Sequence, residues 1–167
     1  ALGGVFGKET GAADIANFRN GDALFQTMWE PHQTSAFMNT GLLWLYEAVT
    51  GTYTGALLFI RFVTAGIQTA LAFYVYKILK PLLKPEYAYV LAVIYFNMSP
   101  KLIQIPEFGN MQHWFFTLLV LFAMEYVSRM QKGTKGAYIF LLLSGVAMAL
   151  EVLSYPSSII LFPFFIV

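Results

Sequence analysis

Apolar residues of the chain gather into long runs, and short polar segments rich in proline, glycine or asparagine separate these runs. A helix needs roughly 20 residues to cross about 30 Å of hydrocarbon. Five apolar runs follow the first fifty residues: 55–79, 87–98, 111–127, 138–153 and 159–167. The second run is short, and the last is cut off by the end of the sequence. Four segments with helix-ending or turn-forming residues separate them: 80–85, 99–110, 131–136 and 155–158. The pattern predicts an all-α fold, a multispan transmembrane helix bundle.

The first fifty residues are more polar and predict two further helices. Gly21 and Asp22 open a stretch, 22–30, that Pro31 closes, which is typical of a short helix. Residues 35–49 form an amphipathic stretch with Trp and Tyr at positions typical of a membrane interface. We therefore expect a first extracytoplasmic loop with two juxtamembrane helices in residues 1–52, and transmembrane helices in residues 53–167. Because the chain starts without Met and stops inside an apolar run, we also expect it to be part of a longer protein.

Composition excludes several classes of protein. With 58% apolar, 17% aromatic and only 11% charged residues, and a mean hydropathy of +0.63, the chain has too little charge to cover a soluble domain. A net charge of +1 without a basic stripe argues against a nucleic-acid partner. Zero cysteines exclude a disulfide scaffold, thiol catalysis and cysteine-rich metal sites. We expect a multi-pass protein of the plasma (inner) membrane.

The charged residues predict the orientation of this bundle. Lys and Arg in short loops stay on the cytoplasmic side of a membrane. Two short turns carry most of the bases: Lys77, Lys80, Lys84, Arg129, Lys132 and Lys135, against the acids Glu86 and Glu125. The other side is acidic, with Glu9, Asp14, Asp22, Glu30, Glu47, Glu107 and Glu151 against Lys8, Arg19 and Lys101. The two turns are therefore expected in the cytoplasm and the acidic side outside.

Polar residues near the apolar body of a membrane protein mark candidate sites, because each costs free energy unless it is paired, hydrated or functional. On the expected outer face they come from two loops. The first loop contributes Arg19, Asp22, Gln26, Glu30 and His32, and the second contributes Lys101, Glu107, Asn110 and His113. A site built from both loops over the helix ends could meet a lipid-linked substrate and a water-soluble one at once.

The segment Gly21-Asp22-Ala23-Leu24-Phe25-Gln26, followed by Glu30 and His32, resembles the first extracytoplasmic loop of the GT-C glycosyltransferases. Mannosyltransferase branches of this superfamily carry an acidic motif, then an aromatic residue and Gln, then Glu and His. The layout is also similar, with Glu107 as the acid of a second outer loop. Two departures are Ala23, where many members have a second acid, and Asn20-Gly21, where mannosyltransferases often have His-Pro.

The resemblance implies a hexosyltransferase that moves a mannose-like hexose from a polyprenyl-phosphate donor to a lipid, glycan or protein hydroxyl on the extracytoplasmic face. Sugar transfer needs a base for the acceptor proton and donor groups for the leaving phosphate. Asp22 falls on the family's catalytic acid and is the expected base; Arg19 and Lys101 are candidates for phosphate contacts. The remaining substrate-binding candidates are Gln26, Glu30, His32, Glu107, Asn110 and His113.

Because alanine and not a second acid follows Asp22 at position 23, the sequence lacks an acidic pair there. This favours a metal-independent site. Should a divalent cation bind, Asp22, Glu107 and His113 are the ligands that we expect within reach.

Other interpretations stay open. Asp22 could simply cap its helix. Arg61 and Glu151, both within apolar runs, could form a structural pair between spans. In a secondary transporter, these same two residues would line the substrate path, and the helices would be broken near the midplane. A non-catalytic assembly subunit is a third possibility.

Overall fold

Proline and glycine residues set the ends of the helices. The computed structural model describes residues 36–98 and 105–165 of the chain, and the elements in this part are all helical. They are α3 (Ala36–Thr50), α4 (Ala56–Leu79), α5 (Pro85–Asn97), α6 (Phe108–Gln131), α7 (Tyr138–Ser154) and the 3-10 helix η2 (Pro156–Phe165). The predicted all-α class is confirmed for these residues. The predicted helix at 22–30 lies outside them.

Two turns illustrate how the sequence ends its helices. Pro85 is the first residue of α5. A backbone N–H at this position would have no partner within the helix, so proline costs no hydrogen bond here. At the end of α6, Gly133 adopts a left-handed conformation with φ 62°. Its N–H donates to the Met130 carbonyl, and the Thr134 N–H donates to the Arg129 carbonyl at 3.0 Å. This is a Schellman motif, which satisfies the last carbonyls of the helix.

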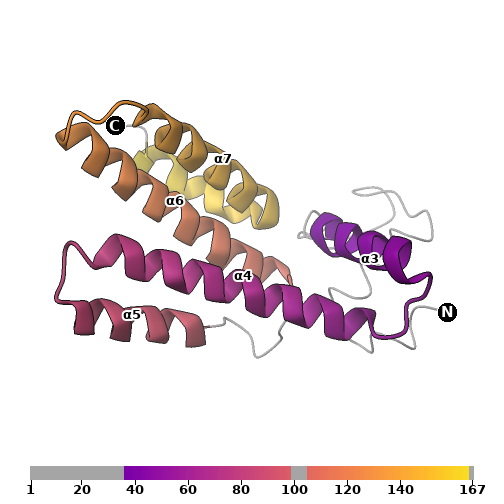
Figure 1. Ribbon diagram of the computed structural model, residues 1–167. Coiled ribbons are helices and arrows are strands. Elements are labelled where there is room, and N and C mark those ends of the chain that lie inside the picture. Colours follow the sequence, from indigo (N-terminus) through magenta and orange to yellow (C-terminus); the bar gives the residue numbers. More distant parts are fainter. Residues whose placement is uncertain (1–35, 99–104, 166–167) are drawn as a thin grey trace.

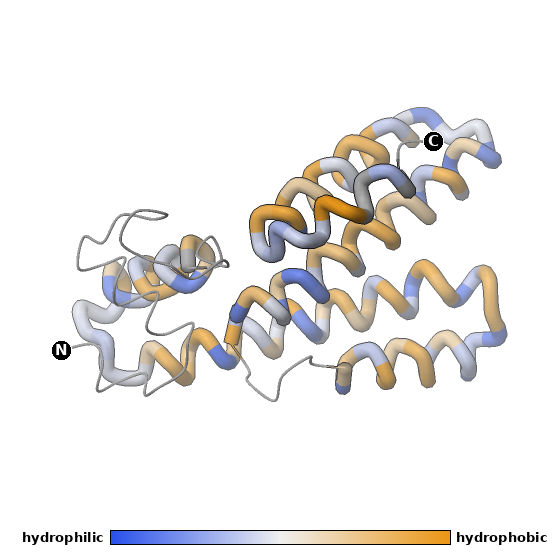
Figure 2. The backbone as a smooth tube through the Cα atoms, turned by 180° about the vertical axis from the view of Figure 1, so that it is seen from behind, coloured by the Kyte–Doolittle hydropathy of each residue, from blue (hydrophilic) through white to orange (hydrophobic). Residues whose placement is uncertain are grey.

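The helices pack as two hairpins (Figure 1). α4 packs against α5 and α6 packs against α7, while α4 also contacts α6 and so joins the two pairs. η2 runs back along α7, and α3 packs near the start of α4, where Leu43 meets Ala56 and Ile60. Both tight turns lie at the same end of the bundle, and Figure 2 shows hydrophilic residues in them between apolar helix bodies. We call this the basic end, since it carries the lysines of residues 77–84 and 132–135.

Small and polar residues face inward in several helices, and large apolar residues face outward. In α5, Ala88 and Ala92 are buried, whereas nearly all of its large side chains are exposed. In α7 the buried residues are Ser144, Ala147, Met148, Glu151 and Ser154, and leucines cover the outer face. The Ser144 hydroxyl donates to the Leu119 carbonyl of α6 at 3.1 Å. Close contact through small residues and hydroxyl groups is typical of helices that pack within a membrane.

Within the described residues, α4 alone has both the length and the apolar composition to cross a membrane. Its 24 residues correspond to about 36 Å at 1.5 Å per residue. α7 is apolar but has 17 residues, and the 13 residues of α5 reach only about 20 Å. The short apolar run 87–98 of the sequence therefore corresponds to a short helix, α5.

Two expectations differ from the structure. The last run, expected as a truncated span, is the 3-10 helix η2, in which Pro163 has no N–H to donate to a regular α-helix. Arg61 and Glu151 do not pair: Arg61 is exposed on α4, Glu151 is buried on α7, and the ion pair found among the described residues joins Arg129 to Glu125. α4 is apolar on all sides, so its sequence pattern carried no information on which way Arg61 would face.

Candidate functional site

The start of α6 holds two buried polar residues. Glu107 is the N-cap, with extended backbone angles, and its carbonyl accepts the Met111 N–H at 2.9 Å. Its side chain is only 2% exposed. One turn further, the Asn110 amide donates to the Ile105 carbonyl at 2.7 Å and fixes the chain that leads into the helix. A carboxylate and an amide are thus held at the end of the bundle opposite the basic end.

Helix α3 contributes a third buried polar residue to the same place. The Asn39 amide donates to the Pro106 carbonyl at 2.6 Å, and Asn39 is 1% exposed. This bond joins residues 67 positions apart and ties the end of the first loop to the second. We call Asn39, Glu107 and Asn110 the loop junction. The sequence predicted that polar site residues of the two loops would meet over helix ends; the first-loop residues of that set lie outside the described residues, so this meeting stays a prediction.

A second polar group lies between α6, α7 and η2. Glu151 is 1% exposed, and its Oε2 atom has no hydrogen-bond partner among the described residues. The Ser158 side chain lies next to the Glu151 carboxylate and accepts a bond of 3.3 Å from the Gln112 amide. Burying a carboxylate without full hydrogen bonding costs free energy. Glu151 therefore lowers the stability of the fold, and a functional role is one reason for a protein to keep such a residue.

His113 faces a different helix from these residues. Its ring stacks on Tyr95 of α5, with ring centres 4.8 Å apart and an angle of 20° between the planes. Its Nε2 atom is buried without a hydrogen-bond partner among the described residues. No group of three His, Asp or Glu side chains in this part of the chain could hold a metal ion.

The other predicted site residues cannot be placed against these groups. Arg19, Asp22, Gln26, Glu30, His32 and Lys101 lie outside the described residues. Of the remaining three, Glu107 and Asn110 share the loop junction, whereas His113 packs against α5. The expected substrate-binding set is therefore brought together in part.

Asn39 and Gln68 were missed by sequence reasoning. Gln68 sits within α4 and bonds to both neighbouring helices: its Oε1 accepts the Trp114 indole N–H at 2.6 Å, and its Nε2 donates to the Tyr95 carbonyl at 3.0 Å. Each of the two is a lone amide in an apolar run, and that is the signal that could have found them, because an amide in such a place needs a hydrogen-bond partner.

Comparison of the chain with protein-family models, with curated proteins and with solved structures finds no match. A proposal for its function therefore rests on its own residues. The loop junction places a buried carboxylate and two amides, all groups that form hydrogen bonds, at one end of an apolar bundle.

Proposed function

We propose that this chain is the N-terminal part of a multispan membrane glycosyltransferase of the GT-C type, whose site lies at the extracytoplasmic end of the helices. Its donor is a polyprenyl-phosphate hexose, and its acceptor is a hydroxyl of a lipid, glycan or protein. Asp22 is the general base of this proposal.

The outward-facing apolar surface supports a multispan arrangement. Soluble monomers rarely expose large continuous apolar patches. Here α5 exposes Tyr87, Val90, Ile94 and Phe96 while it buries two alanines, and α7 exposes Leu142 and Leu153 beside a buried Glu151. This distribution suits lipid outside and polar contacts inside.

The position of the bases supports the proposed orientation. The turn between α4 and α5 and the turn between α6 and α7 share one end of the bundle (Figure 1). Lysines and arginines in such turns are retained in the cytoplasm. The loop junction, at the opposite end, then faces outward.

One observation carries the functional proposal: Asn39 of α3 is hydrogen-bonded to Pro106 directly beside the buried Glu107. The bond joins the helix that follows the Asp22 motif to the loop that bears the second acid. A glycosyltransferase of this layout needs both loops at one helix end, where a donor in the membrane can meet an acceptor in water.

The proposed reaction is a displacement at the anomeric carbon of the donor sugar. The acceptor oxygen forms a bond to this carbon while the bond from the carbon to the phosphate oxygen breaks. The acceptor proton passes to the Asp22 carboxylate, and polyprenyl phosphate leaves with the electron pair of the broken bond. Arg19 and Lys101 are the cations proposed to stabilise the leaving phosphate. Glu107 and Asn110 are proposed to orient the acceptor by hydrogen bonds.

A donor-turnover assay tests this class of activity. Membranes that contain the full-length protein are supplied with polyprenyl-phosphate-linked mannose, and in parallel with a nucleotide-linked mannose. Release of polyprenyl phosphate, dependent on the protein and accompanied by a glycosylated product, is the expected result. Sugar transfer from the nucleotide donor alone would contradict the proposal.

The transporter alternative gains no support from the described residues. α4, α6 and α7 run without a break, and Arg61 does not meet Glu151. A transporter of this design needs interrupted helices around its substrate path.

A further inference from the structure

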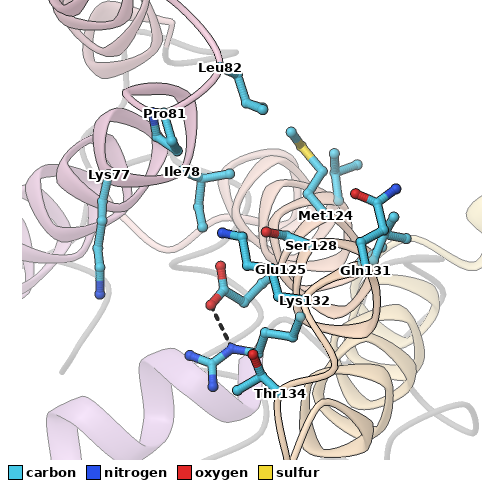
Figure 3. A pocket seen from close by; sticks show the side chains of 14 residues that line it. Lys77, Ile78, Pro81, Leu82, Met124, Glu125, Ser128, Gln131, Lys132 and Thr134 are labelled. Carbon is cyan, nitrogen blue, oxygen red and sulfur yellow. Dashed lines mark hydrogen bonds and ion pairs between the residues drawn. The ribbon is translucent and has the colours of Figure 1, made fainter.

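A cavity of about 710 Å³ opens between the two hairpins at the basic end of the bundle. Figure 3 shows its walls. One wall comes from the end of α4 and the following turn, with Lys77, Ile78, Pro81 and Leu82. The other comes from the last three turns of α6, including Met124 and Ser128. Its volume falls within the range of roughly 300–1,000 Å³ that is usual for ligand sites.

The cavity has an apolar inner part. Ile78, Leu82, Val120, Met124 and Val127 line it, and both Leu82 and Val127 are also exposed at the surface. The apolar lining is therefore continuous with the outward-facing apolar surface of the helices, where lipid chains lie if the bundle is in a membrane. A ligand that fits these walls has an apolar chain.

The rim of the cavity carries surplus positive charge. Three cations line it, but Arg129 is already engaged, with its Nε atom 2.7 Å from Glu125 and its guanidinium over the Phe140 ring at 4.3 Å. Lys77 and Lys132 remain, one from each hairpin, and neither forms an ion pair with another described residue. Ser128 and Thr134 also line the cavity, and their hydroxyls are further hydrogen-bond donors.

We propose that this cavity binds an anionic phospholipid of the cytoplasmic leaflet. Lys77 and Lys132 hold the headgroup phosphate from the two hairpins, and the acyl chains extend between α4 and α6. Basic pockets between membrane helices on the cytoplasmic side are known to bind anionic headgroups. The lipid would link the two hairpins, whose outer helices α5 and α7 pack little against each other.

The combination of charge and apolar walls favours a lipid over a free phosphate or an acidic peptide. A phosphate ion would use the lysines but leave the apolar walls hydrated, and an acidic peptide would have to place polar backbone against them. The lipid-binding proposal depends on the membrane placement of the helices and not on sugar transfer. Lipid binding can therefore fail while the proposed enzyme activity stands, and the enzyme activity can fail while lipid binding stands.

Native mass spectrometry of the full-length protein tests the proposal. The protein is released from nanodiscs and titrated with phosphatidylglycerol, with phosphatidylcholine of the same acyl chains, and with inorganic phosphate. Phosphatidylglycerol is expected to bind most tightly. The variant Lys77→Gln with Lys132→Gln is expected to weaken its binding by about 25-fold, because each basic residue near an anionic lipid surface contributes about a fivefold gain.

A matched variant separates this site from general attraction to the basic end. Lys84→Gln with Lys135→Gln removes the same charge from the same end of the bundle but outside the cavity, and should leave phosphatidylglycerol binding nearly unchanged. Ala123→Phe, which fills the cavity and keeps every charge, should also weaken binding. Equal losses in the two lysine variants, or equal binding of phosphatidylcholine or inorganic phosphate, would overturn the proposal.

Discussion

Asn39 and Pro106 are joined by a 2.6 Å hydrogen bond from the Asn39 amide to the Pro106 carbonyl, and both residues are fully buried. The bond fastens α3 to the loop before α6. Asn39→Leu, which is similar in size, leaves the carbonyl without its partner, and we expect a loss of about 1–3 kcal/mol of stability. Thermal unfolding of the full-length protein in nanodiscs measures it.

The control for this prediction is Thr69→Ala on α4. Thr69 is exposed, and among the described residues its hydroxyl bonds only to the Ala65 carbonyl of its own helix. Its removal should change the unfolding temperature little. If Asn39→Leu were as stable as Thr69→Ala, the loop junction would not hold the two loops together.

Gln68 is predicted to couple three helices. Gln68→Met keeps the volume but removes the bonds to Trp114 and to the Tyr95 carbonyl, and we expect it to cost about 1–3 kcal/mol. Trp114→Phe removes the indole N–H together with part of the buried ring. In a double-mutant cycle the two changes should be non-additive, since they share one hydrogen bond. Additive losses in the measured free energies of unfolding would show that this bond contributes no coupling.

Gly55 and Gly66 are predicted to respond to alanine in opposite directions. Gly55 has φ 88°, and an added Cβ would lie 2.9 Å from the Tyr46 hydroxyl oxygen, so Gly55→Ala should destabilise the protein by about 1 kcal/mol or more. Gly66 is inside α4 with no atom within 4 Å of such a Cβ. Gly66→Ala should stabilise by about 0.5–1 kcal/mol. Denaturation curves of the two variants measure the change in the free energy of unfolding. A change of the same sign in both would contradict the left-handed conformation of Gly55.

The positions of helices in this chain could be predicted from the sequence, because prolines and glycines mark their ends. The run 55–79 became α4 (Ala56–Leu79), and the run 35–49 became α3 (Ala36–Thr50). The rotation of each helix about its axis could not be predicted. An apolar pattern on all sides does not select a buried face, so the pairing of Arg61 with Glu151 was wrong.

The candidate site was predictable to a lesser degree. Glu107 and Asn110 are buried at the start of α6, and a site at the second loop stays a prediction. The contact through Asn39 depends on the crossing of α3 over the loop before α6, a relationship between residues 67 positions apart that no local pattern encodes. Whether Asp22 joins them lies outside the described residues.

The orientation of the bundle can be tested with single cysteines, because these 167 residues contain none. Thr52, Lys84, Lys135 and Ser157 are all exposed. On intact cells, a membrane-impermeant maleimide should label Thr52→Cys and Ser157→Cys, whereas Lys84→Cys and Lys135→Cys should react only after permeabilisation. Labelling of the two lysine positions on intact cells would reverse the proposed topology.

The account depends most on the Asp22 carboxylate as the base in sugar transfer. Its direct test is the initial rate of hexose transfer from a polyprenyl-phosphate donor by Asp22→Asn, which keeps the size and the helix-capping ability of the residue but cannot accept the proton. Asp14→Asn, an equal charge change in the same loop, is the control. We predict that Asp22→Asn lowers the rate by about 10²–10⁴-fold while Asp14→Asn leaves it unchanged. An Asp22→Asn protein that transfers sugar at the full rate would contradict the account.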